Sequence, residues 1–326
     1  MNVPNCVRAL AAAVTPLLLS ACAGLPAPGM SSGAVPSQVP PAIASELQRI
    51  GRVVAPPPTA ALYAPLQQKE PYAGVAVARD QRYGPDARHL LDVFTAAGAA
   101  GAAKPVLVFV HGGGFTGGNK RSGDSPFYDN IALWAVKNGM VGVNITYRLA
   151  PQHRWPAAQE DLAAALAWVR ANIGARGGDA RRIYVMGHSA GAAHVAQYIG
   201  HPQFHVAPGG GIAGAILVSG IFDLVTAQKN PPLQAYFGTD AARYPQLSAL
   251  PGMVRARIPL LLAFAELDPS DFHEQSEQAR GALCEARRCP QLLQLQGHSH
   301  MSEVYAIGTA DTALTAPLLS FVQARR

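Results

Sequence analysis

The sequence predicts an α/β protein with a mainly parallel central sheet and helices on both of its faces. Three observations support this prediction. Short apolar runs alternate with helical patterns from about residue 70 onward. One helical pattern forms a clear apolar stripe, and a Gly-x-Ser-x-Gly turn directly follows one of the apolar runs. Alternating strands and helices build parallel sheets, which bind ligands beyond the carboxyl ends of their strands.

The strand predictions rest on short apolar runs, several of them bounded by Gly or Pro. They cover residues 106–110, 141–147, 183–186, 215–219, 260–265 and 292–295. The clearest helix covers 157–173, with an apolar stripe at spacings of 4, 3 and 4 formed by Leu162, Leu166, Val169 and Ile173. Pro156 opens this helix, where its missing N–H is tolerated, and Gly174 ends it.

Composition limits the classes of protein. A chain of 326 residues suits one large α/β domain or two smaller ones. With 49% hydrophobic and 14% charged residues, it can bury a sizeable core without help from metals. The net charge is +6, but the basic residues are scattered and form no basic helix, so we expect no binding to nucleic acid. The sequence gives no sign of an obligate protein partner.

The first residues resemble a bacterial lipoprotein signal. Arg8 precedes a run of small and apolar residues over 9–19, too short to span a bilayer, and the segment ends Leu19-Ser-Ala-Cys22. The resemblance implies cleavage before Cys22 and a lipid anchor on its sulfur. Because Ala23 is not an aspartate, we expect the periplasmic face of the outer membrane in a Gram-negative cell. The alternative is an ordinary secretory signal that is cut nearby.

We therefore expect three parts in the chain: a signal peptide over 1–21, a tether over 22–65 and a catalytic domain over 66–326. The tether is rich in Pro, Ala, Ser and Gly. Within it, Ile43, Leu47 and Ile50 have helical spacing and Gly51 follows as a stop signal, so a short helix is predicted there.

The cysteines agree with export. Cys6 leaves with the signal and Cys22 would carry lipid, so Cys284 and Cys289 remain as an even pair. In an oxidising compartment these two can form a disulfide across a short loop. The alternative is two free thiols.

The turn Gly187-His188-Ser189-Ala190-Gly191 carries most of the functional information. It follows the apolar run at 183–186 and precedes a helical pattern over 190–199, which is the context of a nucleophile elbow. Its glycines allow the tight turn that exposes a serine hydroxyl. A second copy of the pattern, residues 29–33, has neither strand before it nor helix after it, so we interpret it as chance.

A serine nucleophile needs a base and a group that orients the base. Asp268 directly follows the apolar run at 260–265. Two other acids compete with it: Asp271, better suited to a helix N-cap because Glu274 follows three residues later, and Glu266, nearer the strand end. For the base, His298 and His300 both follow the last apolar run. No zinc-like ligand set accompanies them, so we expect neither a metal nor another cofactor.

The run His111-Gly-Gly-Gly114-Phe115 follows the predicted strand at 106–110. Glycine allows close approach of the backbone, so N–H groups here can bind an oxyanion. The alternative is a merely flexible loop. His111 itself is expected to fix the loop by hydrogen bonds.

Together these motifs resemble the α/β-hydrolase fold, specifically the hormone-sensitive-lipase-like esterases. The resemblance rests on the glycine loop at 111–115, the segment 147–161 and the turn at 187–191. The segments 219–224, 268–269 and 298–303 are closer to feruloyl-esterase-like and kynurenine-formamidase-like hydrolases. The similarity covers roughly residues 75–320. It implies a triad and an oxyanion hole, namely Ser189, Asp268 and His300 with the backbone N–H groups of Gly113, Gly114 and Ala190. Asp161 and Asp223 match family positions and are interpreted as structural.

The predicted function is hydrolysis of carboxylic esters through an acyl-enzyme. Segments 42–72 and 225–257, with Tyr236 and Phe237, are expected to form a small cap whose composition favours short-acyl or aromatic esters. One alternative is an arylformamidase-type amide hydrolase, which the resemblance disfavours because Gly114 stands where formamidases tend to carry an aromatic residue. The other is a non-catalytic surface lipoprotein, disfavoured because all candidate residues are present.

Overall fold

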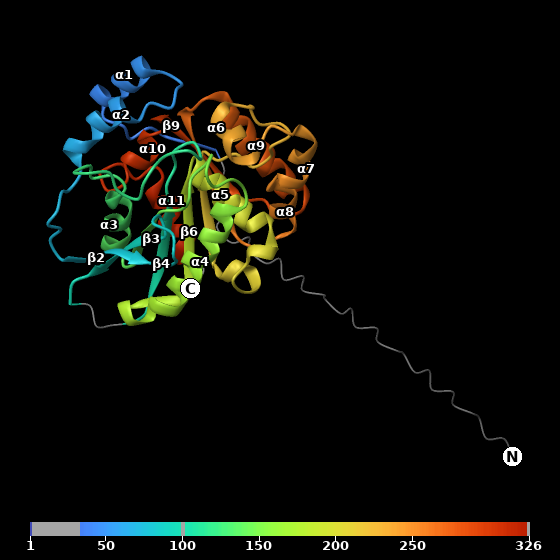
Figure 1. Ribbon diagram of the computed structural model, residues 1–326, viewed down its shortest axis with the longest axis horizontal. Helices are drawn as coiled ribbons and strands as arrows, with labels where there is room; N and C mark the ends of the chain where they lie inside the picture. Colours follow the sequence, from blue (N-terminus) through green and yellow to red (C-terminus); the bar gives the residue numbers. More distant parts are fainter. Residues whose placement is uncertain (2–32, 99–101, 325–326) are drawn as a thin grey trace. The chain divides into compact units, whose positions relative to one another are not determined.

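The computed structural model describes Met1 and residues 33–98 and 102–324, which lie almost wholly in one compact unit, Ser32–Arg326. The predicted signal peptide and Cys22 lie outside the described residues. Within the compact unit one sheet runs in the order β1-β9-β8-β7-β6-β4-β5-β3-β2 (Figure 1). Its strands are β1 Gly33–Val35, β2 Val75–Arg82, β3 Leu90–Ala96, β4 Lys104–Val110, β5 Val141–Ile145, β6 Gly178–His188, β7 Gly214–Val218, β8 Leu260–Leu267 and β9 Gln291–Ser299.

The central strands are parallel, and only the pairs β2–β3 and β3–β5 are antiparallel. The six apolar runs predicted from the sequence correspond to β4 through β9, and the α/β fold class is confirmed. Strands β1, β2 and β3 were not among the predicted runs. In β2 the side chains are polar or partly exposed, because the strand lies at the sheet edge.

Helices cover both faces of the sheet. They are α1 Pro41–Ile50, α2 Pro56–Tyr63, α3 Asp129–Lys137, α4 Ala157–Asn172, α5 Ala190–Gly200, α6 Pro231–Phe237, α7 Tyr244–Leu247, α8 Leu250–Arg255, α9 Ser270–Glu285, α10 Ser302–Tyr305 and α11 Thr315–Gln323. In the part of the chain that the structure describes, none of them combines the length and apolar character needed to cross a membrane.

The alternation of side chains along β4 divides the core into two layers. Val106, Val108 and Val110 pack with α4, α5, α8 and α9 on one face. Leu107 and Phe109 point to the other face, which α1, α2, α3, α10 and α11 cover. The predicted stripe of α4 is buried throughout, so this helix is confirmed.

The N-terminal part of the compact unit differs from the prediction. The sequence predicts a tether over 22–65, but residues 33–65 belong to the same compact unit as the sheet. Strand β1 pairs in parallel with β9, and the side chains of Leu47 and Tyr63 are almost fully buried. The predicted short helix is confirmed as α1, which ends at Gly51 with φ 82°. In Figure 1, α1 and α2 lie beside β9 and α10. Because this segment has the composition of a tether, the sequence did not predict these buried contacts.

Cys284 and Cys289 form a disulfide at the end of α9. The loop that they close precedes β9, and the Arg288 guanidinium within it donates to the carbonyls of Met253 and Val254 on α8. The loop is therefore held both by its covalent link and by hydrogen bonds to a neighbouring helix.

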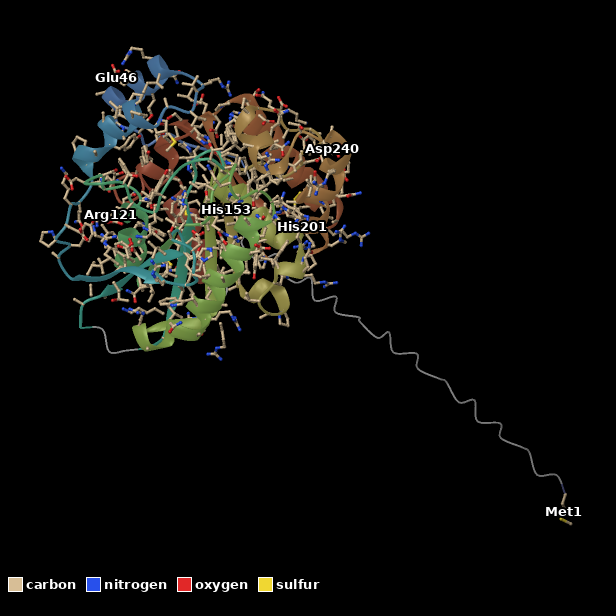
Figure 2. All side chains as sticks on the ribbon, in the orientation of Figure 1. Met1, Glu46, Arg121, His153, His201 and Asp240 are labelled. Atoms are coloured by element: carbon tan, nitrogen blue, oxygen red, sulfur yellow. A yellow bond between two sulfur atoms is a disulfide. The ribbon has the colours of Figure 1, made fainter. Side chains whose placement is uncertain are left out.

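A buried charge network joins β2, β3 and the loop before α3. Arg121, labelled in Figure 2, forms an ion pair with Glu70, which in turn pairs with Arg79 of this network. Asp92 on β3 is fully buried. One of its carboxylate oxygens accepts from Lys120 Nζ at 2.8 Å, and the other accepts from Arg79 Nη1 at 2.9 Å. Arg79 continues the network to Asp129 at the start of α3. Removing one partner from such a network leaves buried charges uncompensated.

We predict that Asp92→Ala lowers the free energy of unfolding by about 3–5 kcal/mol, because Lys120 and Arg79 both lose a buried counter-charge. The matched control is Glu160→Ala, which removes a half-exposed carboxylate from its ion pair with Arg148 and should change stability by less than about 1 kcal/mol. Urea unfolding of the two variants measures both values. Equal losses would contradict the role assigned to the network.

Candidate active site

Ser189 lies in the tight turn between β6 and α5. Its backbone has φ 57° and ψ −125°, an unfavourable conformation for a residue with a side chain. The turn needs glycine on both sides of it. A Cβ atom at Gly187 would lie 2.5 Å from the Gly191 carbonyl oxygen, and one at Gly191 would lie 2.1 Å from that of Val110. A hydrogen bond of 2.9 Å from Ser189 N to Val218 O ties the turn to β7.

Asp268 and His300 are brought together from the ends of β8 and β9. Nδ1 of His300 donates to Oδ1 of Asp268 at 2.7 Å, and both side chains are fully buried. Oδ2 of Asp268 accepts from Ser219 Oγ at 2.6 Å and from Ala265 N at 2.8 Å. Burial opposes ionisation of Asp268, but the charge of His300 and these hydrogen bonds outweigh it and lower the pKa of the carboxyl group. The hydrogen bond to Asp268 places a hydrogen on Nδ1 of His300 and leaves Nε2 as the ring nitrogen not engaged by the acid.

The structure brings the turn at Ser189 close to His300 through the preceding residue. His188 and His300 have ring centroids 4.8 Å apart, and His188 Nε2 donates to the carbonyl oxygen of His300 at 2.8 Å. Nε2 of His300 is buried and has no hydrogen-bond partner among the described residues. A bond between this nitrogen and the Ser189 hydroxyl is therefore not formed here. Such bonds are often long before substrate arrives.

The glycine loop lies against the same turn. A Cβ atom at Gly112 would be 3.0 Å from Cβ of Ser189, so only glycine allows this approach without a shift. Gly113 has φ 130°, and a Cβ there would lie 2.2 Å from the Gly117 carbonyl oxygen. Ala190 is the first residue of α5, so its N–H has no partner within the helix. The glycine loop and the start of α5, both of which carry backbone N–H groups, thus lie next to Ser189.

Aromatic side chains hold the loop in place. Phe115, with φ 65°, stacks on Tyr236 with ring centroids 5.4 Å apart and packs edge-on to Phe237. The Tyr147 hydroxyl donates to the carbonyl of His111 at 2.7 Å. The sequence predicts Tyr236 and Phe237 within a cap, and the structure buries both of them against the loop.

The competing candidates have other contacts. His298 Nδ1 lies 3.0 Å from Ser302 Oγ and its Nε2 lies 3.0 Å from an oxygen of Asp311, so its contacts are local, as expected. Glu266 accepts from Gly297 N at 2.7 Å. The N-cap prediction for Asp271 is wrong: α9 begins at Ser270 after Pro269, and Asp271, in the first turn, accepts from Gln228 N at 3.1 Å.

Three residues expected to be structural have the contacts that such a role requires. His111 is fully buried with Nδ1 2.6 Å from Gly112 O, and burial lowers its pKa to about 3. Asp161 accepts from the Arg148 backbone at 2.7 Å. Asp223 accepts from Val225 N and from Ser248 Oγ, both at 2.9 Å.

Sequence reasoning did not assign four residues that support this site. Ser219, His188 and Glu303 lie within quoted motifs, so their positions were visible but their contacts were not. Nothing in the sequence around Arg52 indicated a contact with the site. Its guanidinium donates to the carbonyl oxygens of Asp268, at 3.1 Å, and Glu266, at 3.0 Å.

His188, His300 and Glu303 are close enough to be considered as metal ligands, with one donor atom of each within 4.8 Å of the others. However, His188 Nε2, which faces Glu303 Oε1 at 3.2 Å, must carry a hydrogen to donate to the His300 carbonyl. It offers no lone pair toward the cluster. The donor set therefore does not suit a metal ion.

Comparison with known proteins identifies the family of the chain. Residues 107–301 match the model of the alpha/beta hydrolase fold family Abhydrolase_3. Two esterases of Mycobacterium tuberculosis are similar. LipQ is 32% identical over 58% of this chain and 46% of its own length. LipC is 39% identical over 33% of this chain and 26% of its own length. The chain thus matches about a quarter to a half of the length of these relatives.

Solved structures show the same fold. Esterase B from Lactobacillus rhamnosis has a TM-score of 0.66 at 18% identity, covering 81% of this chain and 90% of that one. A truncated carbohydrate esterase from gut microbiota has a TM-score of 0.66 at 17% identity, covering 77% of this chain and 96% of that one. The family model spans more than half of the chain and includes the glycine loop, the turn at Ser189 and His300. This protein therefore belongs to the alpha/beta hydrolase fold family.

Proposed function

We propose that the protein is a carboxylesterase that works through an acyl-enzyme, with Ser189 as nucleophile, His300 as base and Asp268 as its orienting acid. The observation that carries the proposal is the buried 2.7 Å hydrogen bond between His300 and Asp268, formed beside a serine in a strained turn. The similarity to proteins named esterases over the same residues supports it.

In this mechanism His300 Nε2 takes the proton of the Ser189 hydroxyl as the oxygen attacks the ester carbonyl. Asp268 stabilises the imidazolium that forms. The N–H groups of Gly113, Gly114 and Ala190 bind the oxyanion of the tetrahedral intermediate. His300 then returns the proton to the leaving alcohol, and a water molecule repeats the sequence to release the acid.

The proposed substrates are short-acyl or aromatic esters. Helix α6 begins close to the glycine loop, since a Cβ atom at Gly114 would lie 3.5 Å from Cβ of Pro232. Behind the loop, Phe115, Tyr236 and Phe237 are buried against one another. These contacts favour a small site over one that accepts long acyl chains.

We also propose that the protein is exported and attached to a membrane through lipid on Cys22, facing the periplasm from the outer membrane. The sequence around Cys22 supports this proposal. Metabolic labelling with a fatty-acid analogue tests it: the wild-type protein should be labelled and Cys22→Ser should not.

The first prediction concerns the nucleophile. Ser189→Ala should lower kcat for nitrophenyl butyrate by at least about a thousandfold, because the attacking oxygen is lost. A fluorophosphonate probe should label the wild-type protein at Ser189, as mapped by mass spectrometry, and should not label the variant. Ser320→Ala, at an exposed serine of α11, is the matched control and should keep both activities.

Near wild-type hydrolysis by Ser189→Ala would contradict the assignment. Labelling that is absent from a folded wild-type protein would favour the alternative of a non-catalytic binding scaffold.

The second prediction concerns the acyl group. Nitrophenyl acetate and butyrate should exceed the laurate ester in kcat/KM by about tenfold or more, because a small pocket rejects added methylenes. Initial rates across the series give this ratio. A maximum at long acyl chains would contradict a small site.

The third prediction separates esters from amides. An aryl ester should be hydrolysed with higher kcat/KM than the formyl anilide of matched structure, since Gly114 occupies the position that is aromatic in the formamidases the sequence resembles. A preference for the formyl anilide would instead support the arylformamidase alternative.

A further inference from the structure

Arg52 reaches the proposed acid from a distant part of the chain. It follows α1, and its exposed guanidinium contacts groups at the end of β8 and on α9. Nε donates to the Asp268 carbonyl oxygen at 3.1 Å, and Nη2 donates to the Glu266 carbonyl oxygen at 3.0 Å. Nη2 also lies 3.1 Å from His273 Nε2, which must accept because a guanidinium has no lone pair to offer.

The protonation state of His273 agrees with this contact. Burial lowers the pKa of its imidazole, Asp268 opposes this shift, and the charge of Arg52 adds to it. His273 is therefore a neutral acceptor at neutral pH. The guanidinium joins three parts of the chain: the end of β8, the residue that follows it and the first turns of α9.

The two carbonyl groups lie where β8 departs from regular pairing. The register between β8 and β9 shifts between Ala265 and Leu267, and Asp268 follows directly. Such an irregularity redirects the side chains beside it. An arginine presents its donors in a rigid planar fork, which fixes two acceptors relative to one another. The fork of Arg52 therefore fixes the direction in which the backbone of Asp268 leaves the sheet.

The strands that carry the acid and the base are linked at the same place. Oε2 of Glu266 accepts from Gly297 N at 2.7 Å, which ties the end of β8 to β9 shortly before His300. Arg52 holds the carbonyl group of Glu266, and the side chain of Glu266 holds Gly297. One guanidinium is thus connected to the backbone on both sides of the bond between acid and base.

The segment around Arg52 also holds the chain that carries the base. Strand β1 pairs with β9, and a Cβ atom at Gly297 would lie 2.4 Å from Ser37 Oγ. Beyond the base, Gln67 Nε2 donates to two carbonyl oxygens at the end of α10, those of Tyr305 at 2.8 Å and Ile307 at 2.9 Å. The N-terminal segment therefore contacts the backbone before and after the proposed base as well as that of the proposed acid.

We propose that Arg52 is a positioning residue that sets the alignment of Asp268 with His300, a role that rests on the proposed function. The 2.7 Å bond between these two side chains requires the loops after β8 and β9 to meet at one distance. Because Arg52 binds the backbone and not the carboxylate, it fixes Asp268 without occupying the oxygen that His300 needs. A misplacement of about 1 Å at such a group can cost about a hundredfold in rate.

The kinetic test removes the donors and keeps the aliphatic stem of the side chain. Arg52→Met should lower kcat for nitrophenyl butyrate about tenfold and change KM by less than about twofold, because the alignment of acid and base is lost while the substrate pocket is untouched. The matched control is Arg49→Met, which removes an exposed guanidinium of α1 that pairs with Glu46. This control should keep the wild-type kcat.

The alignment can also be measured without any substrate. In the wild-type protein the hydrogen on His300 Nδ1 should give a proton resonance far downfield, because its bond to Asp268 is short and charge-assisted. Arg52→Met should shift or broaden this resonance, and Arg49→Met should leave it unchanged. Urea unfolding of the same samples checks that each variant is folded.

The outcomes separate this inference from the proposed function. Wild-type kcat in folded Arg52→Met, a rise in KM alone, or an unchanged Nδ1 resonance overturns the positioning role while the protein remains an esterase. If Arg52→Met does not fold, Arg52→Gln, which cannot form the fork, decides by the same three readouts. Absence of hydrolysis by the wild type, with a resonance that moves in Arg52→Met, overturns the proposed function and leaves the alignment of Asp268 by Arg52 standing.

Discussion

The backbone conformation of Ser189 is the constraint on which the rest of the site depends. Its positive φ is unfavourable, and it persists because the surroundings leave no other path for the chain. Gly191 packs directly on the Val110 carbonyl, and Ser189 N donates a hydrogen bond to Val218 O. The turn is therefore held by contacts with both β4 and β7. The same contact brings the glycine loop, which follows β4, against the serine. One strained residue thus sets the relative placement of a hydroxyl, a helix start and a row of backbone donors.

Much of this arrangement was visible in the sequence, for a physical reason. Buried parallel strands must be apolar along their whole length, so β4 through β9 stand out, and groups that follow them gather at one edge of the sheet. Asp268 and His300 were found by that rule together with the family resemblance. Edge strands obey no such rule: β2 carries Arg79, Asp80 and Arg82, so its apolar residues stop at Ala78, halfway along the strand. The N-cap prediction for Asp271 was wrong because α9 begins after Pro269 without a side-chain cap.

Hydrogen-bond direction is the part that the sequence could not supply. The sequence shows only that three polar residues, Ser219, His188 and Glu303, lie within the motifs. Their contacts with the site are known only from the structure. Ser219 donates to Asp268 and His188 donates to the carbonyl of His300, and neither contact can be read from spacing along the chain.

Residues 33–65 support the sheet and the loop at Asp268, although their composition is typical of a flexible tether. Strand β1 extends the sheet beside β9, and Arg52 holds the backbone carbonyls of Asp268 and Glu266. Asp268 is thus supported from a stretch of chain that lies before residue 107, outside the span of the family model. Removing residues 33–65 would take away the pairing of β1 with β9 and the hydrogen bonds of Arg52 to the backbone at Asp268 and Glu266.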